Sequence, residues 1–311
     1  MRIAIIDLGT NTFNLLVAEI AVNHSYKIIF NTKIGVKLGE GGINSGIIAP
    51  APFQRGVDAM KTHLATLNNY KPEKIFAFAT SAVRSAKNGN DFAAEIKKQT
   101  GINVNIISGE KEAELIYEGV RQALDIGDEK ALVMDIGGGS TEFIICNKEK
   151  IFWKHSFDLG VSRMYEFFRH SEPITQEEIM KIEDYLREKL QPLFHAIEEN
   201  PTDTLIGSSG SFDTFAEMIF FRLYKNESLE NKTSYEFKFE DFYKIHQLII
   251  RSNLDERYKM EGLIEMRVDM IVLSSLFVNF ILREFKFTKM RLSTYALKEG
   301  VLSEITKMMK H

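Results

Sequence analysis

A segment near the N-terminus recurs once, 128 residues further along the chain, where residues 133–145 align without a gap with residues 5–17. Both copies contain an apolar run, an aspartate (Asp7 and Asp135), an apolar residue, a glycine, a polar turn and a second apolar run. Asp-Gly turns between strands are common, so a shorter match could arise by chance. Agreement over the whole segment favours an internal duplication, at an offset of about one domain length.

Short apolar runs alternate with helical patterns through the first half of the chain, which is typical of an α/β fold. From Ser162 onward the patterns are mostly helical. Strands are expected at residues 3–7, 13–20, 26–33, 75–80, 104–107, 131–135 and 141–146, and helices at 52–67, 91–99, 110–124, 163–168, 176–197, 212–224, 239–251, 262–285 and 295–309.

The composition sets limits on the class of protein. With 311 residues, 44% of them hydrophobic and 26% charged, the chain is long enough for about two globular domains and is unlike a disordered tail. The net charge of −4 argues against a nucleic-acid binder that works by bulk positive charge. An anionic ligand would therefore need a local basic or backbone-amide site.

The lone cysteine, Cys146, excludes an intramolecular disulfide and a multi-cysteine zinc site, which suits a reducing cytosol. The longest apolar stretch, residues 271–282, is interrupted by polar residues and is too short to span a membrane. The N-terminal apolar run meets Asp7 at once, unlike a signal peptide. These features predict a soluble cytoplasmic protein.

Three glycine-rich segments follow apolar strands, at Gly9, at Gly137–Gly139 and at residues 207–210. Glycine leaves backbone N–H groups uncovered, so that they can bind a phosphate. Hairpin geometry alone is enough to explain Gly9. A run of three glycines weakens a strand, however, so the three segments together favour a site for oxyanions.

Acidic residues accompany these segments. Asp7 and Asp135 end apolar strands, and Glu142 follows on the return strand of the second copy. Oxygen ligands of this kind suit Mg²⁺, which takes one or two carboxylates, several waters and phosphate oxygens. Turn hydrogen bonds would explain either aspartate alone, but they do not explain Glu142 in an otherwise apolar strand.

Two further residues have two interpretations each. Glu112 borders the apolar stripe of the helix expected at 110–124, so it is either a general base at a cleft or a first-turn acid that complements the helix dipole. From the pattern alone, the second interpretation explains it better. Arg84 follows a strand end, where it would hold a phosphoryl oxygen or simply lie on the surface. The chain has no P-loop, no Gly-x-Gly-x-x-Gly motif and no paired histidines for a metal.

The order of these motifs resembles the exopolyphosphatase / guanosine-pentaphosphate phosphohydrolase (Ppx/GppA phosphatase) family. The most specific of them is Asp-Ile-Gly-Gly-Gly-Ser-Thr-Glu at residues 135–142. The others lie at residues 7–12, 79–84, 108–113, 207–211 and 297–302, so the resemblance covers nearly the whole chain.

The resemblance implies an α/β, two-lobed actin-like ATPase / ribonuclease H-like fold with the active site between the lobes. Residues 1–125 would form the N-terminal lobe and residues 126–294 the C-terminal lobe. A last helix, at about 295–311, would pack back on the first lobe. We expect a hinge near residues 125–128 and closure of the lobes on the substrate.

The resemblance also implies roles for individual residues. Glu112 would activate the attacking water, and Arg84 would hold phosphate. Asp135 and Glu142 would help to hold Mg²⁺, and Asp7 would face the metal and the phosphate. The expected phosphate-binding residues are Gly9, Thr10, Asn11, Gly137, Gly138, Gly139, Ser140, Gly207, Ser208, Gly210 and Lys298.

The implied activity is the removal of terminal phosphate from inorganic polyphosphate, by a homodimer without nucleic-acid or membrane partners. Alternatives are hydrolysis of the 5′-phosphate of guanosine pentaphosphate, a non-catalytic sensor of either molecule, and a kinase or ATPase of the same fold. No sequence feature demands an adenosine pocket or a sugar-binding carboxylate, which disfavours a kinase.

The chain departs from the family pattern in three respects. Long members continue into a C-terminal His-Asp-type helical domain, and this chain stops before it. Many members have arginine where this chain has Lys298, and an ammonium cannot reproduce a bidentate guanidinium contact. Val272 and Leu273 replace a frequent Pro-Gly pair. We expect these departures to affect substrate preference more than the chemistry.

Overall fold

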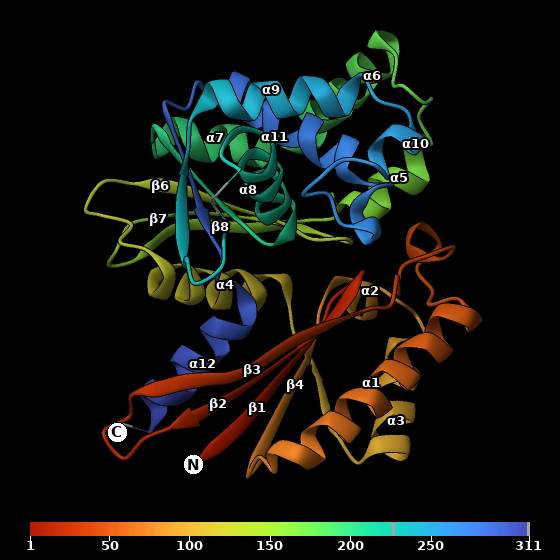
Figure 1. Ribbon diagram of the computed structural model, residues 1–311, viewed down its shortest axis with the longest axis vertical. Coiled ribbons are helices and arrows are strands. Elements are labelled where there is room, and N and C mark those ends of the chain that lie inside the picture. Colours follow the sequence, from red (N-terminus) through yellow and green to blue (C-terminus); the bar gives the residue numbers. More distant parts are fainter. Residues whose placement is uncertain (226–227, 310–311) are drawn as a thin grey trace.

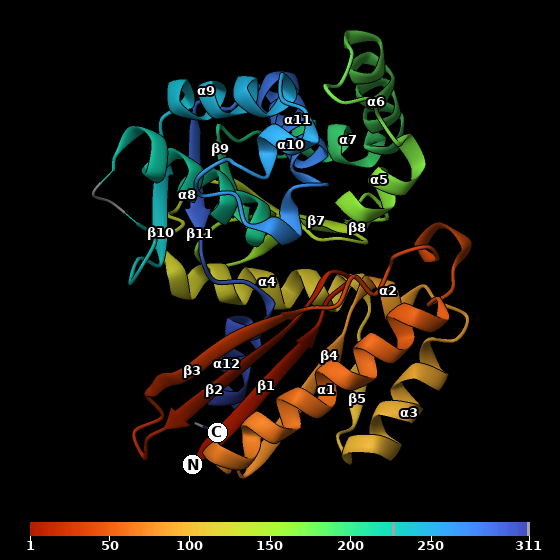
Figure 2. The same ribbon diagram turned by 45° about the vertical axis from the view of Figure 1, so that its right-hand side comes forward.

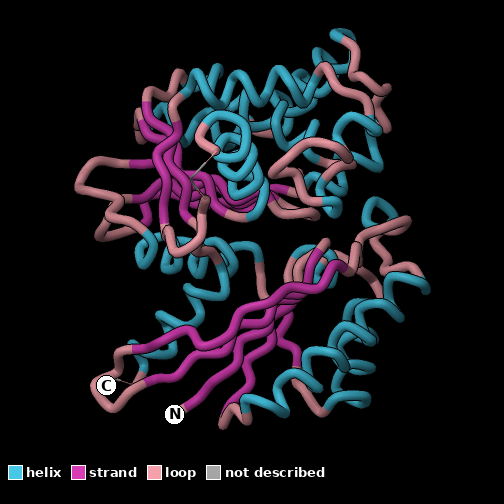
Figure 3. The backbone as a smooth tube through the Cα atoms, in the orientation of Figure 1, coloured by secondary structure: helices cyan, strands magenta, loops and turns pink. Residues whose placement is uncertain are grey.

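The computed structural model describes residues 1–225 and 228–309 and has two lobes, each built on one β-sheet with helices packed against it (Figures 1 and 3). This is the predicted α/β, two-lobed architecture. The chain starts in one lobe, builds the other, and returns to the first in its last helix (Figure 1).

The first sheet has the strand order β3-β2-β1-β4-β5. Side chains alternate between its two faces, as the pleat of a strand requires. Ala4, Ile6 and Leu8 of the first strand pack under two helices, while Ile3 and Ile5 share a core with the two helices that lie between the sheets. The strands are β1 (Arg2–Leu8), β2 (Thr12–Ile20), β3 (Tyr26–Gly35), β4 (Lys74–Ala79) and β5 (Val104–Ile106), and the helices of this lobe are η1 (Ile43–Ser45), α1 (Pro50–Tyr70), α2 (Ser81–Arg84) and α3 (Gly89–Thr100).

The second sheet has the order β10-β11-β9-β6-β7-β8, and its large apolar core lies beneath the remaining helices of that lobe. Its strands are β6 (Ala131–Ile136), β7 (Thr141–Cys146), β8 (Ile151–Phe157), β9 (Thr204–Ser208), β10 (Ser234–Phe237) and β11 (Lys289–Ser293). Its helices are α5 (Val161–Phe168), α6 (Gln176–Lys189), α7 (Gln191–Glu199), α8 (Gly210–Leu223), α9 (Phe239–Ile250), α10 (Leu254–Arg257), η2 (Glu265–Arg267) and α11 (Ile271–Phe285).

The sequence repeat is a repeat of structure. In the first copy β1 and β2 form an antiparallel hairpin that pairs Asp7 with Asn14, and in the second copy β6 and β7 pair Asp135 with Glu142. The turns also match, since the hydrogen bond from Gly9 N to Thr12 O and the one from Gly137 N to Ser140 O both measure 3.0 Å. The two hairpins therefore have equivalent turns, with Asp7 and Asp135 at equivalent positions before them.

Two helices, α4 (Gly109–Ala123) and α12 (Leu297–Met308), lie between the sheets (Figure 2). Their apolar faces share one core cluster with residues of both sheets, including Ile5 and Val133. Glycines allow the helices to touch, because a Cβ on Gly300 would lie 1.7 Å from Leu115 O and one on Gly119 would lie 2.0 Å from Ala296 O. This close contact fixes two helix N-termini near the gap between the lobes.

Two predicted helices were wrong in extent. The helix expected at 262–285 begins only at Ile271, because Gly262 has φ of +80° and the segment after it forms only the short η2. The helix expected at 176–197 is two helices, since Pro192 starts the second one. Strands β8, β10 and β11 were not predicted. The β10 and β11 strands are short, and they pair with each other across about fifty residues of sequence.

The apolar stretch at 271–282 forms most of α11, which is 15 residues long and buried in the second lobe. Within the described residues, no helix is long and apolar enough to cross a membrane.

Because α4 and α12 are in such close contact, adding one methyl group between them should lower the stability of the protein. Gly300→Ala would force the helices apart, and such overpacking typically costs about 1–3 kcal/mol of stability. We expect a lower midpoint of urea unfolding for this variant. Gly35→Ala is the matched control, because its Cβ would meet only Met266 Cε, at 3.6 Å. Equal midpoints for the two variants would contradict the close packing.

Candidate active site between the lobes

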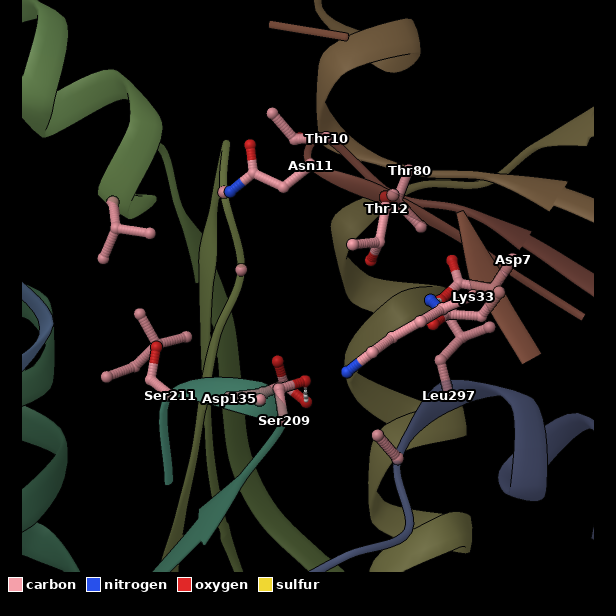
Figure 4. Close-up of a pocket in the computed structure, with 18 of the residues that line it drawn as sticks. Asp7, Thr10, Asn11, Thr12, Lys33, Thr80, Asp135, Ser209, Ser211 and Leu297 are labelled. Atoms are coloured by element: carbon pink, nitrogen blue, oxygen red, sulfur yellow. Dashed lines mark hydrogen bonds between the residues drawn. The ribbon is translucent and has the colours of Figure 1, made fainter. Parts of the chain in front are cut away.

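A cavity of about 430 Å³ lies where the two hairpin turns meet the N-termini of α4, α8 and α12 (Figure 4). It is mainly polar and receives side chains from both lobes. Of the residues predicted for the site, Asp7, Gly9, Thr10, Asn11, Glu112, Asp135, Gly137, Gly138, Gly139, Ser140, Gly210 and Lys298 line it. The other four, Arg84, Glu142, Gly207 and Ser208, do not.

Buried carboxylates surround one side of this cavity. Asp7 accepts a hydrogen bond of 3.0 Å from Asn14 Nδ2, and Asp135 accepts one of 2.8 Å from Ser209 Oγ (Figure 4). Glu142 lies behind Asp135 on β7 and accepts a hydrogen bond of 2.6 Å from Ser156 Oγ. Each acid is therefore oriented by a neighbouring polar side chain.

The environment makes these carboxylates reluctant to ionise. Burial raises the pKa of Asp7 to about 6, against the effect of the Asn14 hydrogen bond. Burial, followed by the charge of Asp135, raises the pKa of Glu142 to about 7. Burial also raises the pKa of Asp135. The site thus concentrates negative charge that nearby protein groups only partly neutralise.

This excess of buried carboxylates fits a divalent cation. Within the described residues, no three side chains of His, Cys, Asp or Glu lie close enough together to enclose a metal by themselves. Mg²⁺ does not need such an enclosure, because it keeps several waters and binds phosphate oxygens as well. Asp7, Asp135 and Glu142 are the groups that would hold it, directly or through water.

Glu112 lies in the wall of the cavity at the start of α4, whose N-cap is Ser108. Its carboxylate forms an ion pair of 2.7 Å with Arg84 Nη1, and the same nitrogen donates to Ile107 O at 3.2 Å. Burial and the charge of Glu142 raise the pKa of Glu112 well above its ordinary value, although Arg84 opposes this shift. Glu112 is therefore held in one orientation, and Arg84 supports it from behind rather than lining the cavity.

The turn at Gly137–Gly139 faces the first lobe across a very short distance. A Cβ on Gly138 would lie 2.8 Å from Asn11 Nδ2, and one on Gly139 would lie 2.6 Å from Ser81 Oγ. A larger residue at either position would require the facing side chains to move. The uncovered backbone of the turn therefore forms part of the cavity wall.

Three basic residues face the acids. Burial works against the charge of Lys298, but Glu299, 2.9 Å away, and Asp7 outweigh it and raise the Lys298 pKa. Lys33 reaches into the cavity from β3 (Figure 4), and burial together with Arg267 lowers its pKa. Arg267 lies directly on Gly210, where a Cβ would collide with the guanidinium.

A buried pair next to these cations has unused hydrogen-bonding groups. Asp213 Oδ1 and Arg267 Nε are both buried and have no hydrogen-bond partner within the described part of the chain. Burial raises the pKa of Asp213 to about 6, although Arg267 opposes the shift. Both side chains line the cavity, so they are available to a polar ligand there.

The third glycine segment, residues 207–210, is not a loop over its whole length. Gly207 and Ser208 are the last two residues of β9, and only Ser209, with φ of +68°, forms the turn. Glycine is needed at 207 for packing, because a Cβ there would lie 2.0 Å from the ring of Phe212. Of this segment, Ser209 and Gly210 line the cavity, and Gly207 and Ser208 do not.

Comparison with known proteins identifies the family. Residues 16–309 match the Ppx/GppA phosphatase family. The chain belongs to this family. It is 30% identical to a putative exopolyphosphatase of Haemophilus influenzae, over 98% of this chain and 92% of that protein. It is also 30% identical to exopolyphosphatase 2 of Mycobacterium tuberculosis, over 70% of each protein.

Solved structures agree with this assignment to the Ppx/GppA family. An exopolyphosphatase from Cytophaga hutchinsonii is 39% identical, with a TM-score of 0.96 over 99% of this chain and 98% of that one. The Ppx/GppA family member from Aquifex aeolicus is 25% identical, with a TM-score of 0.82 over 100% of this chain and 99% of that one. The chain is therefore a phosphatase-family protein across its whole fold.

Sequence reasoning missed Lys33, Asp213 and Arg267 of this Ppx/GppA site. Arg267 was placed inside a predicted helix, where Glu265 and Asp269 on either side give it the pattern of an ordinary charged helix residue. Asp213 follows the third glycine segment in the first turn of α8, which could have marked it as part of the same site. Lys33 ends a strand pattern and gave no signal.

The acidic cluster predicts that one charge-removing variant is more stable than the native protein. Asp135→Asn would remove the repulsion that Asp135 exerts on Asp7 and Glu142. Without Mg²⁺ at pH 8, we expect its free energy of unfolding to rise by about 1–3 kcal/mol, as one pKa unit corresponds to about 1.4 kcal/mol.

Adding Mg²⁺ should make the native protein the more stable of the two. A ligand that binds only the folded state stabilises it by mass action, so the native protein should gain stability with Mg²⁺ and Asp135→Asn should gain much less. Asp128→Asn, at an exposed position, is the control and should behave as the native protein. Equal Mg²⁺-dependent gains for the native protein and Asp135→Asn would argue against metal binding by this cluster.

Proposed function

We propose that this protein is an exopolyphosphatase that removes terminal phosphate from inorganic polyphosphate with the help of Mg²⁺. The observation that carries the proposal is the position of Glu112, a buried base held by Arg84 in the wall of a cavity that also contains the glycine turn. The names of the relatives from H. influenzae and C. hutchinsonii support the same substrate.

The terminal phosphate would lie between the glycine turn and the cations. Backbone N–H groups near Gly138 and Gly139 would donate to its oxygens, and Lys298 would attract it electrostatically. Glu112 would accept a proton from a water as the water oxygen attacks phosphorus, and the bond to the bridging oxygen would break. The shortened polyphosphate would leave with that oxygen.

Mg²⁺ held near Asp7, Asp135 and Glu142 would supply positive charge for the phosphate oxygens. The protein's own contribution is orientation. Arg84 donates to the Glu112 carboxylate and to Ile107 O, so the base has little freedom to turn away from the cavity. A preorganised base needs no rearrangement at the moment of proton transfer.

A second candidate is removal of the 5′-phosphate from guanosine pentaphosphate. A further cavity of about 640 Å³ continues past Lys33 and Arg267, and its wall includes the apolar side chains of Phe221, Leu229 and Ile264. A nucleoside has a planar base that such a wall would accommodate, whereas polyphosphate does not use it. This observation keeps the nucleotide as an alternative substrate.

Phosphate release should separate these candidates. We expect release from tripolyphosphate and from long polyphosphate without any nucleotide, and loss of release when a chelator removes Mg²⁺. Faster release from guanosine pentaphosphate than from either polyphosphate would favour the nucleotide. Tight binding without release would favour a sensor, and a requirement for ATP would favour a kinase or ATPase.

Glu112→Gln should lower the rate of phosphate release by about 10²–10⁴-fold, the usual cost of losing a general base. Substrate binding should change little, because the amide has the same shape. Glu110→Gln is the matched control, two residues away in the same helical turn and half exposed, and should retain full activity. An active Glu112→Gln variant would mean that Glu112 only complements the dipole of α4.

A further inference from the structure

Arg163 connects the glycine turn of the second lobe to the first lobe. Its Nε donates to Gly139 O at 3.1 Å, and its Nη1 donates to Ile43 O, in η1, at 3.1 Å. A third contact, from Nη2 to Asp158 Oδ1, is longer, at 3.4 Å, and lies at the exposed rim. The guanidinium itself is largely buried, with 16% of the side chain exposed.

The carbonyl groups of the turn are all held from α5. Val161 N donates to Gly137 O at 3.0 Å, Ser162 N donates to Gly138 O at 2.8 Å, and Arg163 Nε holds Gly139 O. The first two holders are backbone groups of the helix N-terminus. The third is a side chain, so the orientation of the peptide between residues 139 and 140 depends on Arg163.

Because the peptide bond is planar, holding the carbonyl groups of the turn also sets the direction of its N–H groups. In a trans peptide the C=O and the following N–H point in opposite directions. With the carbonyls of the turn directed at α5, the N–H groups of Gly138, Gly139 and Ser140 point away from it. Because these residues line the cavity, their N–H groups would be available to a phosphate bound there.

The first lobe docks on the same helix. Gly41 N donates to Glu166 Oε1 at 2.6 Å, and Asn44 Nδ2 donates to Arg163 O at 3.1 Å. Figure 2 shows the segment before α1 beneath α5, on the side away from α12. Thus α5 contacts the first lobe through one face and holds the glycine turn with its N-terminus.

We infer that Arg163 is a positioning residue that couples closure of the two lobes to the orientation of the phosphate-binding turn. When the lobes are closed, Ile43 O fixes the guanidinium so that Nε holds Gly139 O. When they separate, Arg163 loses the contact to Ile43 and the peptide after Gly139 is free to rotate. The turn is then fully formed only around an enclosed substrate. This inference rests on the proposed phosphatase function.

Four variants test the coupling with tripolyphosphate and Mg²⁺. Arg163→Met removes the link, and Glu166→Ala weakens docking of the first lobe without touching Arg163 or the turn. The third variant combines both changes. Asp158→Asn is the control, because it removes only the negative charge from the long rim contact of the same guanidinium. Urea unfolding checks that each variant is folded.

We expect Arg163→Met to lower kcat by about 10–100-fold, since loss of one oxyanion donor costs about 10²–10³-fold and a misaligned donor costs less. Glu166→Ala should lower kcat several-fold in the native background and have no further effect beside Arg163→Met. Asp158→Asn should match the native protein. Independent, multiplying effects of Arg163→Met and Glu166→Ala would overturn the coupling, as would an unchanged kcat in Arg163→Met.

Amide hydrogen exchange gives a readout that needs no catalysis. Residues 137–146 should exchange faster in Arg163→Met and in Glu166→Ala than in the native protein and in Asp158→Asn. If Glu166→Ala accelerates exchange only in the first lobe, Arg163 does not transmit closure. If the variants show this exchange pattern but the native protein releases no phosphate from polyphosphate, the proposed function is overturned, while the role of Arg163 in holding the turn is supported.

Discussion

The two lobes meet through glycine backbone that approaches side chains or other backbone so closely that an added Cβ would force a movement. At Gly138 and Gly139 the turn of the second lobe touches side chains of the first, and at Gly119 and Gly300 helices α4 and α12 are in contact. Close packing of this kind cannot absorb an added methyl group without movement. The positions of Glu112, on α4, and Lys298, on α12, therefore follow from these contacts.

Charge is the second constraint, and it opposes folding. Asp7, Asp135, Glu142 and Glu112 lie near one another with little exposure to solvent, and their surroundings raise the pKa of each, so ionising them opposes folding. A fold that only needed to be stable would place apolar residues here. Perturbed acids clustered at a cavity are instead typical of a site built to bind cations and move protons.

The sequence predicted the parts of the site that belong to the repeat, because they are local. Each aspartate, Asp7 or Asp135, lies within a few residues of its own hairpin turn along the chain, and strand pairing keeps the aspartate and its turn together. Lys33, Arg163 and Arg267 reach the site through long-range packing that no local pattern encodes. The family resemblance supplied the role of Glu112, for which the pattern alone favoured a dipole-complementing acid.

The contacts between the lobes differ in kind on the two sides of the site. On the side of α4 and α12, apolar residues of both sheets share one core, and both crossings of the chain between the lobes lie nearby. On the side of α5 the contacts are polar: Asn11 with Ser162, Lys37 with Asp269, Gly41 with Glu166, and Asn44 and Ile43 with Arg163.

This difference decides where the lobes can separate. A typical hydrogen bond contributes a net 0.5–1.5 kcal/mol and a partly exposed ion pair about 0–1 kcal/mol, so opening on the α5 side costs only a few kcal/mol. Opening on the other side would expose a continuous apolar core at about 25 cal/mol per Å². Separation should therefore hinge at α4 and α12, which keeps Glu112 and Lys298 in place while the glycine turn moves away from Asn11.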